Sequence, residues 1–378
     1  MSRLSYEELN DLKDKYNVDT IWSWSRLSTY TEGEDDGWEY MIRYIRKEKV
    51  DTSNIYTILG SASHDAIQKY INGEIEYADM ADMMNEAFLD AKLKGYTFPD
   101  EKIRNGYIDN LIHYFNNVTY PIETMKKSIE KPVIVQLKKP NGDNVIFVGY
   151  IDLLTYEDDK VVIVDFKSSS KGKFSGKSLK KSSRQLQLYA IGISQMFNIP
   201  IENIKLRYDM QKYLKVSYLQ KNGKWSKPTL QERRKWVETQ ENKIRTVLSE
   251  LDYDIMELDE LTMQAINDNS LECLPKEVQE RFKVENGIID MDMTKEMEQE
   301  LTDWCLKNIL EIEERSQADD LDKEFPEPRN IDTFYFNVLA PGLKQFSKSW
   351  QEKQQLQESL LENDVKSQDD DFFENLFS

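Results

Sequence analysis

Cysteine is scarce in this sequence of 378 residues, which contains only Cys273 and Cys305. Two thiols cannot form a disulfide framework or a four-cysteine metal centre, so we expect neither. Long apolar runs are missing as well, since none approaches the roughly eighteen residues that a membrane span requires. The opening residues, MSRLSYEELND, are polar and acidic, which is unlike a signal peptide. We therefore expect a cytoplasmic protein without membrane contact.

Positive charge is in deficit overall but concentrated locally. The chain carries 50 Lys and Arg against 69 Asp and Glu, which gives a formal net charge of −19. A sum of this kind says little about local fields. Residues 167–184, which we call the basic strip, contain six lysines, one arginine and no acid, whereas residues 368–378 contain four acids and no base. The basic strip is a candidate for neutralising phosphates without reading a base sequence.

Hydrophobic patterning predicts helices, then strands, then helices again. Helices are expected within 1–20 and over 55–72, 77–95, 101–127, 182–197, 229–250, 256–268, 275–283, 294–316 and 342–362. Strands are expected over 131–137, 145–156, 161–167, 204–210 and 214–220, and the first three form an antiparallel meander. This order suggests a core in residues 1–215 with an N-terminal helical region, a mostly helical region in 216–362, and an acidic disordered tail in 363–378.

Two aspartates and a lysine share one face of the predicted hairpin. If its turn is centred on Asp158 and Asp159, residue i pairs with residue 317 − i, and Asp152 lies opposite Asp165. Directly opposed side chains have Cβ atoms roughly 4.5–5.5 Å apart. Lys167 comes two residues after Asp165 and therefore projects from the same face.

Like charges in this position repel each other unless something neutralises them. A divalent cation such as Mg²⁺ or Mn²⁺ would do so, and a lysine beside it could orient a water and stabilise charge on a phosphate. The alternative is a solvated ion pair, because the acid-x-lysine triplet is common and recurs at Asp11 and Asp100. The facing aspartate, the apolar strand VVIV and the basic strip favour metal-assisted hydrolysis of a phosphodiester.

Four short motifs follow one another along the chain. They are G-x-x-x-H at Gly60–His64, G-x-x-D at Gly149–Asp152, D-x-K at Asp165–Lys167 and Q-x-x-x-Y at Gln185–Tyr189. In this order they resemble the PD-(D/E)XK nuclease superfamily, and specifically its RecB-like exonucleases, over roughly residues 22–210. The resemblance implies a restriction-endonuclease-like α/β fold, with helices flanking a mixed central sheet and helical N- and C-terminal regions over the cleft.

The resemblance also implies roles for individual residues. His64, Asp152, Asp165 and the backbone carbonyl of Phe166 would bind one or two Mg²⁺ or Mn²⁺ ions, and Lys167 would position or activate the attacking water. His64 is one of only two histidines, and the other, His113, is expected to be a packing residue in an apolar helix.

Further residues would contact the DNA. Gln185 and Tyr189, one helical turn apart, would touch the scissile strand or brace the lysine, although by themselves they resemble an ordinary polar helix face. In the basic strip, which we expect to be a flexible loop, backbone contacts are expected from Lys173, Lys177, Lys180, Lys181 and Arg184. A solvated linker is the alternative.

The chain departs from many of these relatives in one respect. They hold an iron–sulfur cluster through four cysteines, one near the N-terminal helix and three near the C-terminus, and this chain has no cysteine in the corresponding stretches. We therefore predict no iron–sulfur cluster. Packing of Trp38 against the aromatic run Phe334, Tyr335 and Phe336 is expected to tie the two stretches together instead.

The resemblance implies a metal-dependent deoxyribonuclease, with an exonuclease favoured, that serves DNA replication, recombination or repair. The alternatives are a structure-specific endonuclease and a catalytically silent nuclease fold that acts as a scaffold subunit. No G-x-x-x-x-G-K-[ST] motif is present, so any DNA motor is a separate protein. Compact nucleases rich in lysine and glutamate are frequent in phages, which suggests a phage source.

The acidic tail combines its charges with Phe372, Phe373, Leu376 and Phe377. This composition is typical of tails that recruit partner proteins, so we expect a replication or recombination protein to bind it. Two alternatives stay open, namely a solubilising end and a DNA mimic that shields a basic groove.

Overall fold

The computed structural model describes residues 3–33, 35–118 and 120–357. Its contacts divide the chain into two units, the first made of Met1–Ser23 and Thr57–Leu306 and the second of Trp24–Tyr56 and Lys307–Ser378. No helix in the described ranges has the length and apolar character that a membrane span needs.

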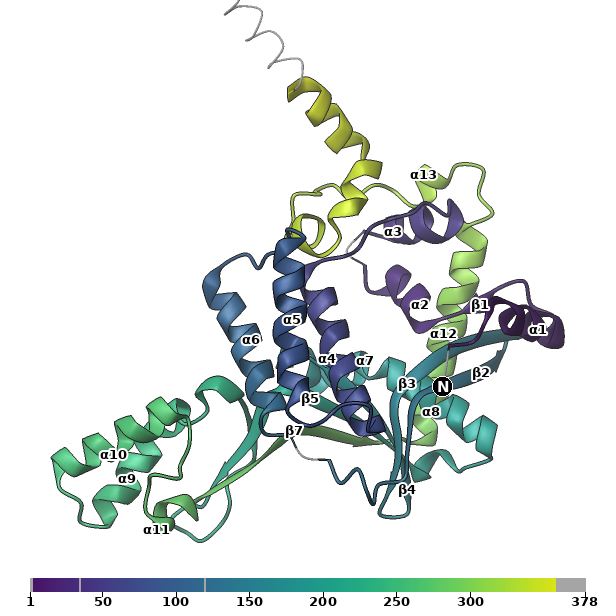
Figure 1. Ribbon diagram of the computed structural model, residues 1–378. Helices are drawn as coiled ribbons and strands as arrows, with labels where there is room; N and C mark the ends of the chain where they lie inside the picture. Colours follow the sequence, from purple (N-terminus) through teal and green to yellow (C-terminus); the bar gives the residue numbers. More distant parts are fainter. Residues whose placement is uncertain (1–2, 34, 119, 358–378) are drawn as a thin grey trace, which may run out of the picture. The chain divides into compact units, whose positions relative to one another are not determined.

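A mixed sheet of seven strands forms the centre of the first unit (Figure 1). Its strands are β1 Ile21–Trp22, β2 Lys127–Lys138, β3 Asn144–Glu157, β4 Lys160–Lys167, β5 Ile204–Tyr218, β6 Thr229–Glu232 and β7 Phe282–Asp292. The order is β1-β3-β4-β5-β6, with β2 also paired to β3 and β7 to β5. The β1–β3 and β4–β5 pairs are parallel and the others antiparallel. The expected α/β fold with a mixed central sheet is confirmed.

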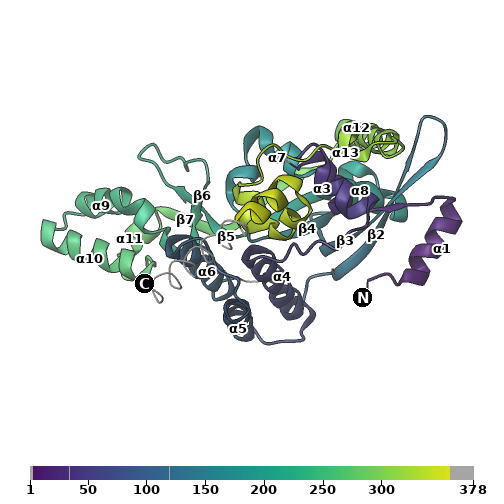
Figure 2. The same cartoon turned by 90° about the horizontal axis from the view of Figure 1, so that it is seen from above.

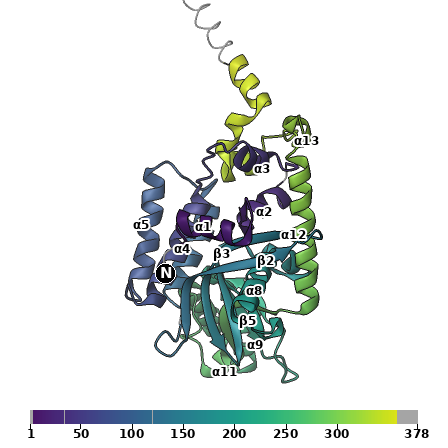
Figure 3. The same cartoon turned by 90° about the vertical axis from the view of Figure 1, so that its right-hand side faces the viewer.

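Helices cover both faces of this sheet (Figures 2 and 3). One face carries α4 Ile55–Asn72, α5 Asp79–Leu93 and α6 Glu101–Phe115, and the other carries α7 Gly176–Ser182 and α8 Arg184–Phe197. The apolar residues of α8 from Leu186 to Ile193 are buried, and Asn198 ends the helix in the left-handed conformation. Gly192 allows α8 to approach the sheet, since a Cβ there would lie 2.4 Å from Val133 Cγ2.

The far ends of β5 and β7 carry a small helical lobe, drawn in green in Figure 1. Its helices are α9 Glu241–Glu250, α10 Ile255–Asp268 and α11 Lys276–Gln279. Trp236, Val237, Ile244, Leu248 and Val278 form the centre of a separate apolar core, into which Leu214 and Val216 of β5 also pack. The lobe is therefore attached to the sheet through shared strands.

Several predicted elements are wrong in extent or type. The helix expected over 101–127 ends at Phe115, and Lys127 already belongs to β2. The two strands expected over 204–210 and 214–220 are one strand, β5. Residues 229–232 form β6 instead of the start of a helix, and β7 replaces the end of the helix expected over 275–283.

The predicted loop and the predicted boundary also differ from the structure. Most of the basic strip is helical, with a 3-10 turn over Lys171–Phe174 followed by α7. The boundary expected after residue 215 falls inside β5, and β7 from the supposedly helical region completes the sheet. Strand pairing between residues far apart in sequence therefore joins the two regions that the sequence analysis separates at residue 215.

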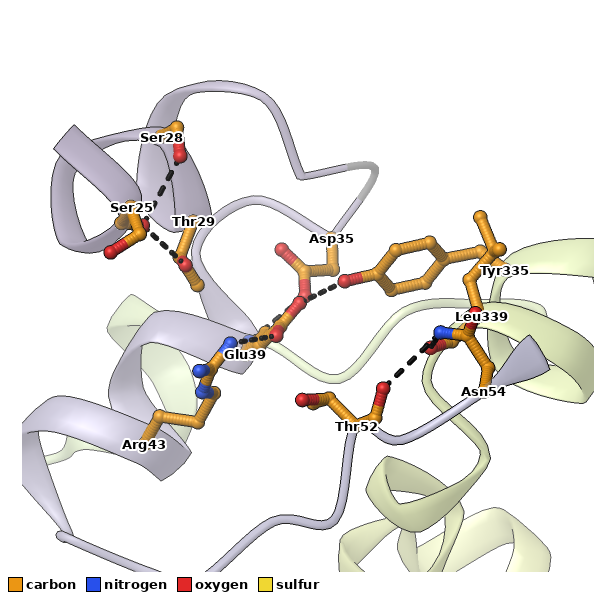
Figure 4. Close-up of polar contacts among 10 residues, drawn as sticks. All are labelled: Ser25, Ser28, Thr29, Asp35, Glu39, Arg43, Thr52, Asn54, Tyr335 and Leu339. Atoms are coloured by element: carbon orange, nitrogen blue, oxygen red, sulfur yellow. Dashed lines mark hydrogen bonds and ion pairs between the residues drawn. The ribbon is translucent and has the colours of Figure 1, made fainter. Parts of the chain in front are cut away.

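The second unit joins residues 24–56 to residues from 307 onward. The carboxylate of Asp35 accepts a hydrogen bond from the backbone N–H of Glu39 in α3 at 2.8 Å. The Glu39 carboxylate in turn pairs with Arg43 at 2.8 Å and accepts a hydrogen bond from the Tyr335 hydroxyl (Figure 4). Burial raises the pKa of Asp35 to about 6, and the neighbouring Glu39 charge adds to the rise.

Aromatic packing supplements this polar network. The rings of Trp38 and Phe336 lie edge to face with centroids 6.2 Å apart, which confirms the expected contact between the two stretches. Asn54 adds a hydrogen bond from its side chain to the Leu339 carbonyl at 2.8 Å. The elements of this unit are α2 Trp24–Thr31, α3 Trp38–Tyr40, a π-helix Met41–Ile45, the end of α12 Lys295–Arg315, α13 Leu321–Glu324, a π-helix Tyr335–Leu339 and a 3-10 helix Pro341–Phe346.

The two ends of the described chain are helical. The first helix, α1 Tyr6–Tyr16, begins with a capping box in which Ser5 and Glu8 bond each other's backbone N–H groups. The last expected helix, over 342–362, is a 3-10 turn and then an α-helix over residues 348–357. The acidic tail expected at 363–378 lies outside the described residues.

Candidate active site

The hairpin of β3 and β4 has the predicted register. Its paired residues run from Glu157↔Lys160 to Leu153↔Val164. Asp158 and Asp159 form the turn with φ values of 48° and 60°, as a two-residue turn with both residues left-handed requires. The ladder ends at Leu153↔Val164, and Asp152 and Asp165 are the residues directly beyond that last pair.

A hydrogen bond and an ion pair tie this position together. The Phe166 backbone N–H donates to Asp152 Oδ2 at 3.1 Å. Lys167 Nζ lies 2.7 Å from Asp165 Oδ2, with the Asp165 side chain 7% exposed and the Lys167 side chain 26% exposed. The Lys167 ammonium therefore offsets part of the Asp165 charge through a short, charge-assisted contact.

The electrostatics of the pair oppose a second negative charge. Burial raises the pKa of Asp152 to about 6, and the Asp165 charge adds to the rise, while His64 and Lys167 reduce it. Burial alone would lower the pKa of Lys167, but the two carboxylates outweigh it and raise that pKa. The site thus keeps its lysine charged and holds one carboxylate whose ionisation costs free energy unless a further cation is present.

His64 approaches the carboxylates from α4. Its Nδ1 lies 3.5 Å from Asp152 Oδ2, and its ring meets the Phe166 ring edge to face at 6.2 Å. No three His, Cys, Asp or Glu side chains within the described ranges are placed to hold one metal ion. The donor set nevertheless suits a divalent metal, because two carboxylates and an imidazole are neighbours and the Asp165 charge helps to raise the pKa of Asp152. The full ligand set, with the Phe166 carbonyl, stays a prediction.

Gln185 and Tyr189 lie together on α8, as predicted, and the Gln185 amide donates to the Tyr189 hydroxyl at 3.2 Å. The Tyr189 ring covers Gly149 of β3, where a Cβ would lie 2.3 Å from the ring. Burial raises the pKa of Tyr189 to about 12, so the hydroxyl stays protonated and can donate. The glycine of the G-x-x-D motif is therefore needed for the tyrosine of the Q-x-x-x-Y motif to pack.

A second cation, which the sequence does not single out, lies near the end of β4. The β5–β7 register shifts between Asp209 and Leu214, and this irregularity places Lys212 outside the regular ladder. Lys212 Nζ lies 4.6 Å from the centroid of the Tyr107 ring, and the Tyr107 hydroxyl donates to Ser168 Oγ at 2.8 Å, directly after Lys167. Burial lowers the pKa of Lys212 to about 8, against the opposing effect of Glu232.

Glu130 is a further carboxylate on β2, the strand that pairs with β3. It falls between the pairs Ile129↔Leu153 and Lys131↔Ile151, and so across the β2–β3 ladder from Asp152. The Gln68 amide, one helical turn after His64, donates to its carboxylate at 3.1 Å. Its sequence position gave only a weak signal, because the register that brings it here depends on the whole β2–β3 pair.

The basic strip divides between two locations. Lys173 is exposed in the 3-10 turn, whereas Lys180 and Lys181 are exposed at the end of α7 and Arg184 opens α8. The side chain of Lys177 is outside the described part of the structure. His113 is half-buried near the end of α6, and burial lowers its pKa to about 4.

The fold and the site define an α/β protein that presents two carboxylates and a lysine on neighbouring strands of its central sheet, with a histidine beside them. A sequence model of the PD-(D/E)XK nuclease superfamily matches residues 21–275, and the chain belongs to this superfamily. No curated protein matches the sequence. Membership makes the protein a nuclease by family, with DNA as the expected ligand and a divalent metal ion as the family's usual cofactor.

Proposed function

We propose that the protein is a metal-dependent deoxyribonuclease, and more specifically a RecB-like exonuclease that serves DNA replication, recombination or repair. The observation that carries the proposal is the proximity of Asp152, Asp165 and Lys167 just beyond one end of the β3–β4 ladder, in a chain of a nuclease superfamily. The ordered G-x-x-x-H and Q-x-x-x-Y motifs on α4 and α8 support the RecB-like assignment.

Asp152, Asp165, His64 and the Phe166 carbonyl would hold Mg²⁺ or Mn²⁺. When bound, such an ion supplies Lewis-acid chemistry, polarising a phosphoryl oxygen and lowering the pKa of a water. The raised pKa of Asp152 is consistent with this role, because a site that disfavours its own second negative charge gains most from a cation.

The chain's own groups position the reactants. Lys167 stays protonated, so it donates hydrogen bonds to the attacking water or to a phosphate oxygen on which charge develops. Tyr189 and Gln185 form one hydrogen-bonded unit beside it and offer donors to the scissile strand. Lys212, half-buried near Ser168, adds positive charge on the β5 side of the site.

The test is cleavage of linear and covalently closed circular DNA of the same sequence, with Mg²⁺ or Mn²⁺ and with EDTA. Wild type should shorten the linear DNA from its ends and leave the circle intact, and Asp165→Ala should leave both substrates intact. Cutting of closed circles would favour an endonuclease. Absence of cleavage on both substrates with both ions would sink the proposal and favour the scaffold subunit.

A further inference from the structure

A recess away from the paired carboxylates is formed by the end of α7, the start of α8 and the first half of α12, all within the first unit. Its volume is about 320 Å³, and its lining includes Lys180, Lys181, Arg184, Gln187, Glu300 and Trp304. Three cationic side chains therefore face one carboxylate. A recess of this charge attracts an anion.

Arg184 is held in a defined orientation at this recess. Its guanidinium carbon lies 3.9 Å from the centroid of the Trp304 ring, which is a close cation–π contact. Stacking of this kind fixes the plane of the guanidinium, whose N–H groups match the oxygens of a phosphate. Because Arg184 is the first residue of α8, the positive end of the helix dipole adds to the attraction.

The backbone beneath the lysines is also fixed. Gln187 is buried, and its amide donates to Ser183 Oγ at 2.7 Å and to the Lys180 carbonyl at 3.1 Å. These bonds fasten the last turn of α7 to α8 and so hold Lys180 at the rim. Lys180 pairs with Glu300, but the two side chains are 61% and 59% exposed. An exposed pair of this kind is worth little, so Lys180 can exchange its partner for a phosphate.

The recess and the catalytic pair lie on different faces of α8. Gln185 and Tyr189 are four residues apart on one face, whereas Arg184 and Gln187 project from the opposite one, given the roughly 100° between successive residues. An α-helix with its side chains is about 10–12 Å across. An anion in the recess is therefore a helix width away from the scissile phosphate, a span that a continuous DNA strand can cover.

We propose that this recess binds a backbone phosphate of the DNA strand, a few nucleotides from the scissile bond, through Arg184, Lys180 and Lys181. A DNA strand must therefore be long enough to reach from the catalytic pair to the recess before it binds tightly. This inference rests on the proposed function, since it assumes that DNA occupies the catalytic pair. A free mononucleotide or inorganic phosphate offers the same chemistry, and the experiment below separates these sources.

The experiment measures the affinity of fluorescein-labelled oligothymidylates of 4, 8, 12 and 20 nucleotides by anisotropy in EDTA, so that no cleavage occurs. Arg184→Ala should weaken binding of the longer strands about tenfold, as expected for one charge-assisted contact, and should lower the salt slope by about 0.7. Binding of the 4-nucleotide strand should not change. Trp304→Ala should have a similar effect, and Trp304→Phe should retain most of the affinity.

Two further variants separate this effect from misfolding and from loss of charge in general. Glu300→Gln should strengthen binding of the longer strands, because it frees Lys180 from its competing carboxylate, and a damaged fold cannot produce a gain. Lys94→Ala, which removes an exposed lysine at the end of α5, should leave affinity unchanged. Equal losses in Arg184→Ala and Lys94→Ala, or a loss in Arg184→Ala that is the same at every length, would overturn the inference.

The remaining outcomes distinguish the ligand sources and the two proposals. Competition by inorganic phosphate or thymidine monophosphate at micromolar concentration, without length-dependent DNA binding, would assign the recess to a free anion and overturn the inference. If wild type cleaves DNA and Arg184→Ala binds and cleaves it equally well, the proposed role of the recess is overturned and the proposed function stands. Length-dependent binding that Arg184→Ala abolishes, in a protein that cleaves no DNA, would support the recess and overturn only the proposed function.

Discussion

Replacing Asp152 by asparagine should make the metal-free protein more stable while it removes activity. Asparagine has the same shape and can still accept the hydrogen bond from the Phe166 N–H, but it carries no charge. The rise in the pKa of Asp152 from its ordinary 3.8 to about 6 corresponds to about 3 kcal/mol, at about 1.4 kcal/mol per pH unit. That rise already includes the favourable effects of His64 and Lys167, so Asp152→Asn should recover on the order of 2–3 kcal/mol.

The pH dependence gives this prediction its sign. The folded protein holds the Asp152 proton up to about pH 6, whereas the unfolded chain loses it near pH 3.8. Stability is therefore full below pH 3.8 and falls as the pH rises toward 6, with the loss complete above 6. Asp152→Asn should unfold at a temperature a few degrees above that of wild type at pH 7.5, since an unfolding entropy of about 2.1 cal/mol/K per residue gives roughly 1–2 °C per kcal/mol for a unit of this size. Near pH 4 the difference should vanish.

The assay is thermal unfolding followed by circular dichroism in EDTA, at pH 4 and pH 7.5, and then with added Mn²⁺. Mn²⁺ should stabilise wild type and leave Asp152→Asn unchanged, because only the wild-type site binds the ion. Asp165→Asn is the matched control, and it should be less stable than wild type because it leaves the Lys167 ammonium without its partner at 2.7 Å. An Asp152→Asn protein that is no more stable than wild type at pH 7.5 in EDTA would refute the reasoning.

Three further predictions follow from the packing and charge of the site. Gly149→Ala should lower the free energy of unfolding in urea by about 1–3 kcal/mol and reduce DNA cleavage, because the new Cβ would lie 2.3 Å from the Tyr189 ring. The double variant with Tyr189→Ala should recover this loss of stability. Gly60→Ala should leave the free energy of unfolding unchanged or raise it by roughly 0.5–1 kcal/mol, because Gly60 lies in the middle of α4 and its new Cβ would meet Ser168 Oγ at an ordinary 3.5 Å. A loss of more than about 1 kcal/mol would contradict the structure. The affinity of wild type for DNA should fall above pH 8 by up to tenfold per pH unit as Lys212 loses its proton. Lys212→Arg should bind DNA equally well at pH 7 and pH 9. Identical pH profiles for the two proteins would rule out a contact from Lys212.

Local sequence determines the parts of the site that were predicted correctly. The hairpin register follows from the two-residue Asp158–Asp159 turn, which fixes the pairing sum, and the apolar run of β4 is buried on both faces. The expected range of α4, with Gly60 and His64 one turn apart, matches the structure residue for residue. In these segments the pattern, the turn residues and the buried face all agree.

The missed features depend on pairing between distant residues. β7 has the sequence FKVENGIIDMD, whose alternation is weak because it faces solvent along much of its length, and only its pairing with β5 makes it a strand. That pairing also creates the irregularity that places Lys212 near Ser168, so no inspection of residues 204–218 alone could have found this cation. Gly287 permits the same irregularity, since a Cβ there would lie 2.6 Å from the Tyr213 carbonyl oxygen.

The recess at α7, α8 and α12 has the same origin. Arg184 and Trp304 are separated by more than a hundred residues, and their contact depends on how α12 packs beside α8. The basic strip was recognised by its charge, but its serines and glycines suggested a loop, whereas Ser182 and Ser183 connect two helices through hydrogen bonds to Lys173 and Lys180. The composition of the basic strip thus predicted its positive charge but not its helical conformation.

The central claim is that the paired carboxylates of the β3–β4 hairpin cleave DNA with a divalent metal. The most direct measurement is cleavage of end-labelled linear DNA in Mn²⁺ by wild type and by Asp152→Asn, at a temperature where circular dichroism shows both to be folded. We predict degradation by wild type, none in EDTA, and none by Asp152→Asn in spite of its greater stability. Cleavage by Asp152→Asn at the wild-type rate would contradict the claim.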